Sequence, residues 1–293
     1  MRRVAAIDIG TNSTRLLVVE GAGGVIKRIE TGLTTTRLGE GIAGGLLLPG
    51  AMERTVQAVR VFKQTALNLG AEKIVAAATS AVRDASNQSE FLKLVKKGTG
   101  LHLRVLSGEE EAALSYRGVL AGLVALPHST VVLDIGGGST ELTWQQSGRL
   151  RLVSVNAGAV RMTETGEGEA EISALLRPAL EEIKSLPFKN LVGVGGTVTT
   201  LAAIDQRLAV YDPERVHGYC LSAGSVDRIL NMLKDMDIKE RRKVPGLQPE
   251  RADIIVAGVV ILKTVLSGLG LSWMYVSECD MLYGLLLEEV EIK

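Results

Sequence analysis

Apolar and polar residues follow one another along the chain in the pattern of alternating strands and helices. The first 40 residues contain apolar runs separated by turn residues, which predicts strands in a β-meander. Between Met52 and Ala66, apolar residues recur every three or four positions, which predicts an amphipathic helix. Predicted strands at 73–79 and 101–107 then alternate with predicted helices at 80–97 and 109–123. This order implies parallel strands with helical crossovers, so the first domain is predicted to be α/β.

A repeat organises the whole sequence. IDIGTNST at residues 7–14 recurs as LDIGGGST at residues 133–140, which puts the two aspartates 126 residues apart (134 − 8), about one domain length. A second meander begins there and is followed by further helices and strands. We therefore predict two tandem α/β domains, residues 1–125 and 126–293, with the last helix free to pack back on the first domain.

The composition favours a soluble globular protein. The chain has 293 residues, of which 46% are hydrophobic and 23% are charged, enough to build sizeable cores. Its 33 basic residues match 33 acidic ones, so no global positive field holds long nucleic acid or an acidic membrane. The longest apolar stretch, 254–262, is about half of the roughly 20 residues that a bilayer span needs. We expect neither long nucleic acid nor a membrane as a partner.

Few cysteines and histidines are present, which argues against a zinc or disulfide framework. The two cysteines, Cys220 and Cys279, lie outside any metal-ligand spacing, and the first residues show no export signal. A reducing cytoplasm is the expected location. The absence of a Walker A sequence and of a GxGxxG turn opening a helix argues against P-loop and dinucleotide-binding folds.

The repeated Asp-Ile-Gly turns suit a phosphate. A strand that ends in such a turn exposes backbone N–H groups and hydroxyls in a concavity that matches phosphate oxygens. The aspartates, Asp8 and Asp134, stand at strand ends where carboxylates can hold Mg²⁺. The alternative is two plain hairpins in which each aspartate accepts turn hydrogen bonds. The second copy of the motif favours the phosphate interpretation.

A third glycine turn places Gly195 and Gly196 after a short predicted strand, with Thr197 as the predicted N-cap of the next helix. Helix N-termini attract anions. Taken alone, these residues favour an ordinary strand-to-helix turn.

One acidic residue and one arginine have spacing that suits catalysis. Ser107 and Glu110 are predicted to form a capping box at the start of a helix, which leaves Glu111 on another side of the first turn, where it is available as a base. Arg83 follows a predicted strand, and its guanidinium can bind a phosphate bidentately. An ion pair with Asp84 or Asp8 is the alternative role for Arg83.

Several longer segments carry a family resemblance. They are AAIDIGTNSTRLLVVE, TRLGEG at 36–41, ATSAVRDASN at 78–87, LSGEEEA at 106–112, LDIGGGSTEL, GAVRMTE at 158–164, VGVGGT, RVHGY and VPGLQPERADII at 244–255. In these blocks and in their order, the chain resembles the exopolyphosphatase and guanosine pentaphosphate phosphohydrolase (Ppx/GppA) family over nearly its whole length.

The resemblance implies two ribonuclease-H-like domains of the actin/sugar-kinase superfamily with an interdomain cleft. It implies a hydrolase that uses Mg²⁺, or Mn²⁺, to release terminal orthophosphate from inorganic polyphosphate. Glu111 matches the family's catalytic glutamate. The implied phosphate-binding residues are Asn12, Ser13, Thr14, Arg83, Gly136, Gly137, Gly138 and Ser139; Gly195, Gly196 and Thr197 are candidates for nucleotide binding, and Asp8, Asp134 and Glu141 for the metal.

Other functions stay open at this point. Guanosine pentaphosphate (pppGpp) is the alternative substrate, and a sugar kinase of the same superfamily is the alternative enzyme. A module that binds guanosine polyphosphates or assembles like actin, without hydrolysis, is the alternative outside enzymes. Family members often form dimers, so a homodimer is expected. Longer members carry additional C-terminal domains, so this two-domain form is expected to have a short polyphosphate channel.

Overall fold

The computed structural model describes residues 2–22, 25–123 and 129–291. By its internal contacts the chain divides into two compact units: unit 1 is Met1–Gly118 with Met281–Lys293, and unit 2 is Val119–Asp280. The last helix thus belongs to unit 1. The boundary expected between residues 125 and 126 lies outside the described residues.

Unit 1 is built on a five-stranded sheet in the order β3-β2-β1-β4-β5. Strands β1, β2 and β3 form the antiparallel meander that the first 40 residues predict, whereas β4 and β5 continue the sheet in parallel with β1. The strands are β1 (Arg2–Ile9), β2 (Ser13–Ala22), β3 (Val25–Thr35), β4 (Lys73–Ala78) and β5 (Leu103–Val105); the helices are η1 (Ile42–Gly44), α1 (Pro49–Asn68), α2 (Ser80–Asp84), α3 (Gln88–Thr99), α4 (Gly108–Gly122) and α12 (Met281–Glu291).

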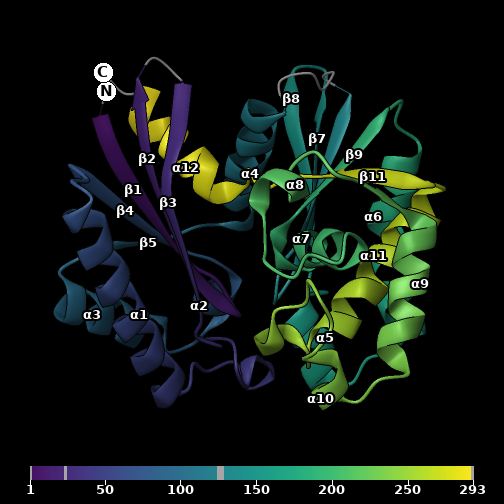
Figure 1. Cartoon of the computed structure of the whole chain (residues 1–293), viewed down its shortest axis with the longest axis horizontal. Helices are drawn as coiled ribbons and strands as arrows, with labels where there is room; N and C mark the ends of the chain where they lie inside the picture. The colour runs from purple at the N-terminus through teal and green to yellow at the C-terminus, as the bar shows by residue number, and fades with distance from the viewer. Residues whose placement is uncertain (1, 23–24, 124–128, 292–293) are drawn as a thin grey trace. The chain divides into compact units, whose positions relative to one another are not determined.

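Alternate side chains of β1 face two different cores, as the twofold period of a strand requires. Ala5, Ile7 and Ile9 pack with residues of α1 and α3. Val4 and Ala6 pack on the other face with Leu114 of α4 and with apolar residues of α12. The sheet of unit 1 therefore lies between two helical layers, which explains why β1 is buried from Val4 to Ile9 (Figure 1).

The helix predicted at 80–97 is two helices, and the prediction of one is wrong. The chain leaves α2 at Ala85, whose backbone is extended, and α3 begins only at Gln88. Between them the amide of Asn87 accepts from Leu47 N–H and donates to Leu47 C=O, both at 2.9 Å. This side chain serves the backbone of a distant segment, which a local periodicity does not reveal.

Unit 2 repeats this plan with additions. Its six-stranded sheet has the order β10-β11-β9-β6-β7-β8, in which β8-β7-β6-β9 matches β3-β2-β1-β4 of unit 1 and β10 is an extra edge strand. The strands are β6 (Thr130–Ile135), β7 (Thr140–Gln146), β8 (Arg149–Val155), β9 (Asn190–Val194), β10 (Cys220–Ser222) and β11 (Trp273–Val276); the helices are α5 (Ala159–Thr165), α6 (Glu169–Lys184), α7 (Gly195–Asp205), α8 (Pro213–Val216), α9 (Ala223–Lys234), α10 (Ile238–Arg241), η2 (Pro249–Arg251) and α11 (Ile255–Leu269).

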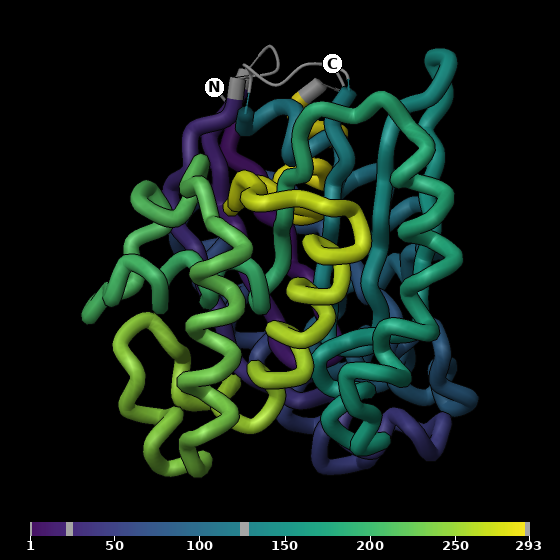
Figure 2. The backbone as a smooth tube through the Cα atoms, turned by 90° about the vertical axis from the view of Figure 1, so that its right-hand side faces the viewer, coloured from purple at the N-terminus to yellow at the C-terminus, as the bar shows by residue number. Residues whose placement is uncertain are grey.

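The most apolar helix, α11, is the centre of the core of unit 2. Figure 2 shows it as the yellow-green helix between α6 and α9. Its buried residues join those of β6, β9 and α7 in a single cluster. In the part of the chain that the structure describes, α11 and every other helix are too short or too polar to cross a membrane.

Helix α12 joins unit 1 through a close contact between backbones. A Cβ atom on Gly284 would lie 2.1 Å from the carbonyl oxygen of Leu114, a distance that no side chain tolerates. Leu285 and Leu286, next along α12, are buried in the same core. The glycine therefore sets how closely α12 approaches α4.

We expect Gly284→Ala to lower the free energy of unfolding of unit 1 by about 1–3 kcal/mol, because overpacking a close contact has that cost. Equilibrium urea unfolding measures it. Gly44→Ala is the matched control, since a Cβ there meets nothing within 4 Å, and we expect its effect to stay within about 0.5 kcal/mol. Equal stability of the two variants would show that α12 does not need this contact.

Candidate functional site

The repeated motifs form two hairpin loops with the same backbone. Loop A is residues 10–13, from the end of β1 to the first residue of β2, and loop B is residues 136–139, between β6 and β7. Each is closed by a hydrogen bond from its first N–H to its last carbonyl, 3.1 Å in loop A and 3.0 Å in loop B. The strand pairs beside them have the same register, Ile9 with Thr14 and Ile135 with Thr140.

The polar residues of the loops are buried. Asn12, Ser13 and Ser139 are each at most 8% exposed, and the Asn12 amide donates to the Ser13 hydroxyl at 3.2 Å. Thr14, expected among the phosphate-binding residues, is fully buried, and its hydroxyl bonds with that of Thr36 at 3.1 Å. Thr14 therefore has a structural partner within unit 1.

The strand-end aspartates of the two repeats lie opposite residues of different charge. Asp8 lies across from Arg15, whose Nε and Nη2 donate to its Oδ2 at 2.9 and 2.7 Å. At the equivalent position of unit 2, Asp134 lies across from Glu141. The same backbone thus holds an ion pair in unit 1 and two carboxylates in unit 2.

The carboxylates of unit 2 are of the kind that can hold a divalent cation. Residues directly opposite on antiparallel strands have Cβ atoms about 4.5–5.5 Å apart, so the two carboxylates lie close enough to share one ion. Glu141 is 2% exposed, and its Oε1 accepts from the Ser154 hydroxyl at 2.8 Å. Among the described residues no cluster of three or more His, Cys, Asp or Glu side chains forms a site. Mg²⁺ commonly takes one or two carboxylates and completes its shell with water and phosphate oxygens.

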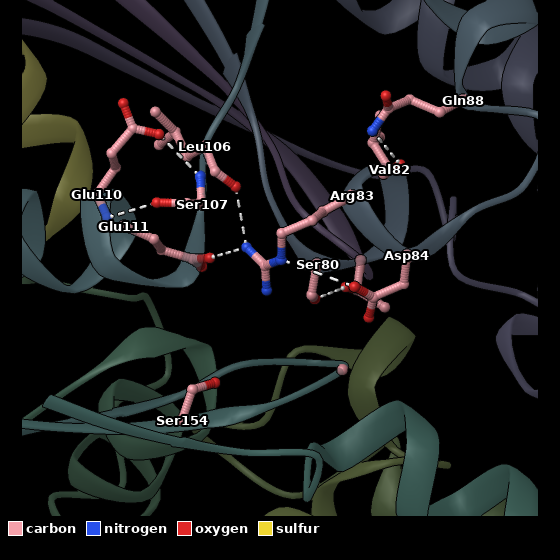
Figure 3. A network of polar contacts seen from close by, with 12 residues as sticks. Ser80, Val82, Arg83, Asp84, Gln88, Leu106, Ser107, Glu110, Glu111 and Ser154 are labelled. Atoms are coloured by element: carbon pink, nitrogen blue, oxygen red, sulfur yellow. Dashed lines mark hydrogen bonds and ion pairs between the residues drawn. The ribbon is translucent and has the colours of Figure 1, made fainter.

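In unit 1, Arg83 of α2 and Glu111 of α4 form an ion pair (Figure 3). The Arg83 Nη1 donates to Glu111 Oε2 at 2.9 Å and to the Leu106 carbonyl at 3.1 Å, whereas Asp84 lies farther away, at 3.7 Å from Nε. Only 13% of the Glu111 side chain is exposed. Arg83 thus orients a mostly buried carboxylate at the start of α4.

The capping box predicted beside this pair is confirmed. Glu110 N–H donates to the Ser107 hydroxyl at 3.1 Å, and Ser107 N–H donates to Glu110 Oε2 at 2.9 Å. The hydrogen bond from Arg104 is the main reason that the pKa of Glu110 lies below its ordinary value, with the Ser107 N–H as the next cause. Glu110 therefore serves the helix, and the neighbouring Glu111 is directed to Arg83.

The third glycine turn differs from its prediction. Helix α7 begins at Gly195 with Val194 as N-cap, so the prediction that Thr197 caps the helix is wrong. Thr197 is the third residue of the helix, and its side chain is buried against Gly258 of α11. The reason is that Gly195, with φ of 87°, turns the chain directly from β9 into the helix.

Two charged side chains contact this turn. A Cβ on Gly195 would lie 2.8 Å from Asp134 Oδ1, so the turn borders the carboxylate pair. A Cβ on Gly196 would lie 2.2 Å from Nη1 of Arg251, which is 9% exposed. Sequence reasoning missed Arg251 as a neighbour of Gly196, although it lies within the segment 244–255 that carries part of the resemblance.

Comparisons with known proteins identify the family of the chain. The model of the Ppx/GppA phosphatase family matches residues 17–292. The chain belongs to the Ppx/GppA phosphatase family. Exopolyphosphatase 2 of Mycobacterium tuberculosis strain H37Rv is 32% identical in an alignment of 313 residues, gaps included, that covers 98% of each chain. The crystal structure of the Aquifex aeolicus Ppx/GppA family member is 32% identical, with a TM-score of 0.81 over 99% of this chain and 97% of that chain.

A further relative shows this family unit inside a longer protein. The bifunctional 3-dehydroquinate synthase/phosphatase of Fusobacterium nucleatum is 33% identical over 99% of this chain. The chain spans 47% of that relative's length. The predicted membership of the Ppx/GppA family and the two-domain α/β fold are thus confirmed.

In this Ppx/GppA protein, we expect Ser107→Ala to lower the free energy of unfolding by about 1 kcal/mol, because it removes the capping hydroxyl. Ser107→Thr keeps that hydroxyl and should retain most of the stability.

Glu110→Gln should lower the free energy of unfolding at neutral pH. The pKa of Glu110 is lowered in the folded state. The carboxylate therefore stabilises the fold fully above its unfolded-state pKa, and this stabilisation is lost as the pH falls through its folded-state pKa. Urea unfolding at several pH values measures this; a pH-independent difference would contradict it.

Proposed function

We propose that this protein is a hydrolase of phosphoanhydride bonds that releases terminal orthophosphate from inorganic polyphosphate. The observation that carries the proposal is Glu111, a mostly buried carboxylate that Arg83 holds while its neighbour Glu110 caps the helix. Membership of a phosphatase family and the similarity to Exopolyphosphatase 2 support it. The free cysteines are consistent with a reducing cytoplasm, which we propose as the location.

In the proposed reaction, water attacks the terminal phosphorus in line with the bridging oxygen. The new bond joins the water oxygen to phosphorus, and the bond from phosphorus to the bridging oxygen breaks, so the chain leaves one phosphate shorter. Glu111 takes the proton of the attacking water. Loop A and loop B each bind phosphoryl oxygens through their N–H groups, and Arg83 does so through its guanidinium. Positioning and electrostatic stabilisation provide most of the catalysis in reactions of this kind.

The proposed metal ligands are Asp134 and Glu141. A Mg²⁺ ion bound there would neutralise negative charge on phosphate oxygens. Asp8 was the third expected ligand, but its Oδ2 already accepts twice from Arg15, so we assign it mainly to holding the strand end beside loop A. Ser154 orients Glu141 through its hydrogen bond, as outer residues of metal sites commonly do.

We expect Glu111→Gln to reduce orthophosphate release about 10²- to 10⁴-fold while the fold is retained, because the variant keeps the shape but cannot accept a proton. Release from short polyphosphate, long polyphosphate and pppGpp, assayed in parallel with Mg²⁺ or Mn²⁺, measures it. The matched control is Glu109→Gln, an exposed carboxylate of the same helical turn, which should keep the rate of the unmodified protein.

Three measurements decide among the alternatives: relative release rates, phosphate transfer from ATP, and nucleotide binding. Faster release from pppGpp would make the guanosine nucleotide the substrate. Transfer of phosphate from ATP to a sugar hydroxyl would indicate a kinase. Tight binding of a guanosine polyphosphate without any release would indicate a binding module, and the hydrolase proposal would fail.

We expect Glu141→Gln to raise the Mg²⁺ concentration needed for half-maximal binding about tenfold or more, as the loss of site residues typically does. Titration calorimetry with Mg²⁺ alone measures the affinity, and the Mg²⁺ dependence of phosphate release provides a second readout. Glu182→Gln, an exposed carboxylate of α6, is the control and should bind as the unmodified protein does. Unchanged affinity in Glu141→Gln would remove Glu141 from the metal site.

A further inference from the structure

Two segments have no role in the proposed mechanism, and each donates hydrogen bonds to the backbone carbonyls of one loop, the first to loop A and the second to loop B. Clamp A is residues 36–39, directly after β3, and clamp B is residues 157–161, shortly after β8. They overlap the sequence blocks TRLGEG and GAVRMTE, which have little sequence in common. Each clamp therefore follows the third strand of its meander, at the same place in both repeats.

Clamp A binds the carbonyls of loop A. The Gly39 N–H donates to the Thr11 carbonyl and the Arg37 N–H donates to the Asn12 carbonyl, both at 2.8 Å. Arg37 has a φ of 50°, a left-handed backbone that is uncommon for arginine. This backbone conformation is energetically unfavourable for arginine, and it persists when surrounding contacts require it. These two hydrogen bonds are such contacts.

Clamp B binds the carbonyls of loop B with more donors. Ala159 N–H donates to the Gly136 carbonyl at 3.0 Å, and the N–H groups of Val160 and Arg161 donate to the Gly137 carbonyl at 2.9 and 3.0 Å. The Nε of Arg161 donates to the Gly138 carbonyl at 2.8 Å. Three successive carbonyls of loop B are thus held by one segment.

Each clamp is also tied to the threonine that follows its loop. The Thr14 hydroxyl bonds with that of Thr36, and the Thr140 hydroxyl donates to the Ala157 carbonyl. Two different sequences therefore make equivalent connections to the two copies of the repeat.

The clamps determine where the loop N–H groups point. In a trans peptide the carbonyl of one residue and the N–H of the next point in opposite directions, and the described residues contain no cis peptide bond. Because the carbonyls of residues 11, 12 and 136–138 face the clamps, the N–H groups of residues 12, 13 and 137–139 face away from them. The clamps thus also keep the carbonyl oxygens, which repel an anion, on the side of each loop opposite to its N–H groups.

Glycine permits this approach in clamp B. A Cβ on Gly158 would lie 2.4 Å from both the Gly137 carbonyl oxygen and the backbone carbon of Gly138. Any side chain there would push loop B away from the clamp. The block GAVR therefore combines a close backbone contact at Gly158 with a side-chain hydrogen bond from Arg161.

We propose that clamps A and B are positioning elements that present the N–H groups of loops A and B to phosphate, and that Arg161 is a positioning residue that acts through the Gly138 carbonyl. The inference rests on the proposed function, since it assigns these loops to phosphate binding. The role of Arg161 is assigned to its Nε hydrogen bond to the Gly138 carbonyl.

The test compares Arg161→Met, which removes the donor, with Arg161→Gln, whose Nε2 is attached to Cδ as the arginine Nε is. Arg177→Met, an exposed arginine of α6, is the control. Calorimetry with tripolyphosphate, in a Glu111→Gln background so that the probe is not consumed, measures affinity. We expect Arg161→Met to weaken binding about tenfold, the value of roughly one hydrogen bond to a charged group, and Arg161→Gln to restore most of it.

A second variant addresses the backbone contact. Gly158→Ala should weaken tripolyphosphate binding at least as much as Arg161→Met, whereas Gly224→Ala, which has room for a Cβ, should not. Thermal unfolding checks that each variant folds. If Gly158→Ala does not fold, the Arg161 pair still decides the question.

The outcomes separate the inference from the proposed function. Equal losses in Arg161→Met and Arg161→Gln, abolished at high salt, would show that the arginine charge contacts phosphate directly, and the clamp role would be overturned. Unchanged binding in Arg161→Met would also overturn it, as would failure of the unmodified loops to bind tripolyphosphate. Binding without any phosphate release by the protein with Glu111 intact would instead reject the proposed hydrolysis and leave the clamp result standing.

Discussion

A loop can bind an anion through its backbone only if its carbonyl groups are bonded elsewhere. Buried backbone groups need partners, and in a hairpin loop the strand ladder no longer supplies them. In both repeats the partners come from the segment after the third strand, through Gly39 and Arg37 in unit 1 and through residues 159–161 in unit 2. The return of the chain after the meander therefore supplies partners for the loop carbonyls.

The same scaffold carries different charges in its two copies. Across the first strand pair, Asp8 is neutralised by Arg15, whereas Asp134 faces Glu141. Because the backbone register is identical, the difference comes from one side chain. A duplicated fold thus holds an ion pair in one unit and a pair of carboxylates in the other.

The start of α4 shows how neighbouring residues of one type take different roles. Glu110 points back to Ser107 and Arg104, where it stabilises the helix end. Glu111, one residue and about 100° further around the helix, meets Arg83 instead. The rotation between successive helical residues thus directs one carboxylate to the helix cap and the next to Arg83.

The sequence by itself determined the repeat, the α/β class, most strands and helices and the capping box, because these depend on patterns within a few residues or on two copies of one motif. The tertiary structure decided the rest. Arg15 opposite Asp8 follows from strand register, the burial of Thr197 from the position of α11, and the clamps from a return of the chain after a third strand. The last two join segments that are distant in the sequence, and the first depends on the exact pairing of two strands, so only the folded backbone brings these residues together.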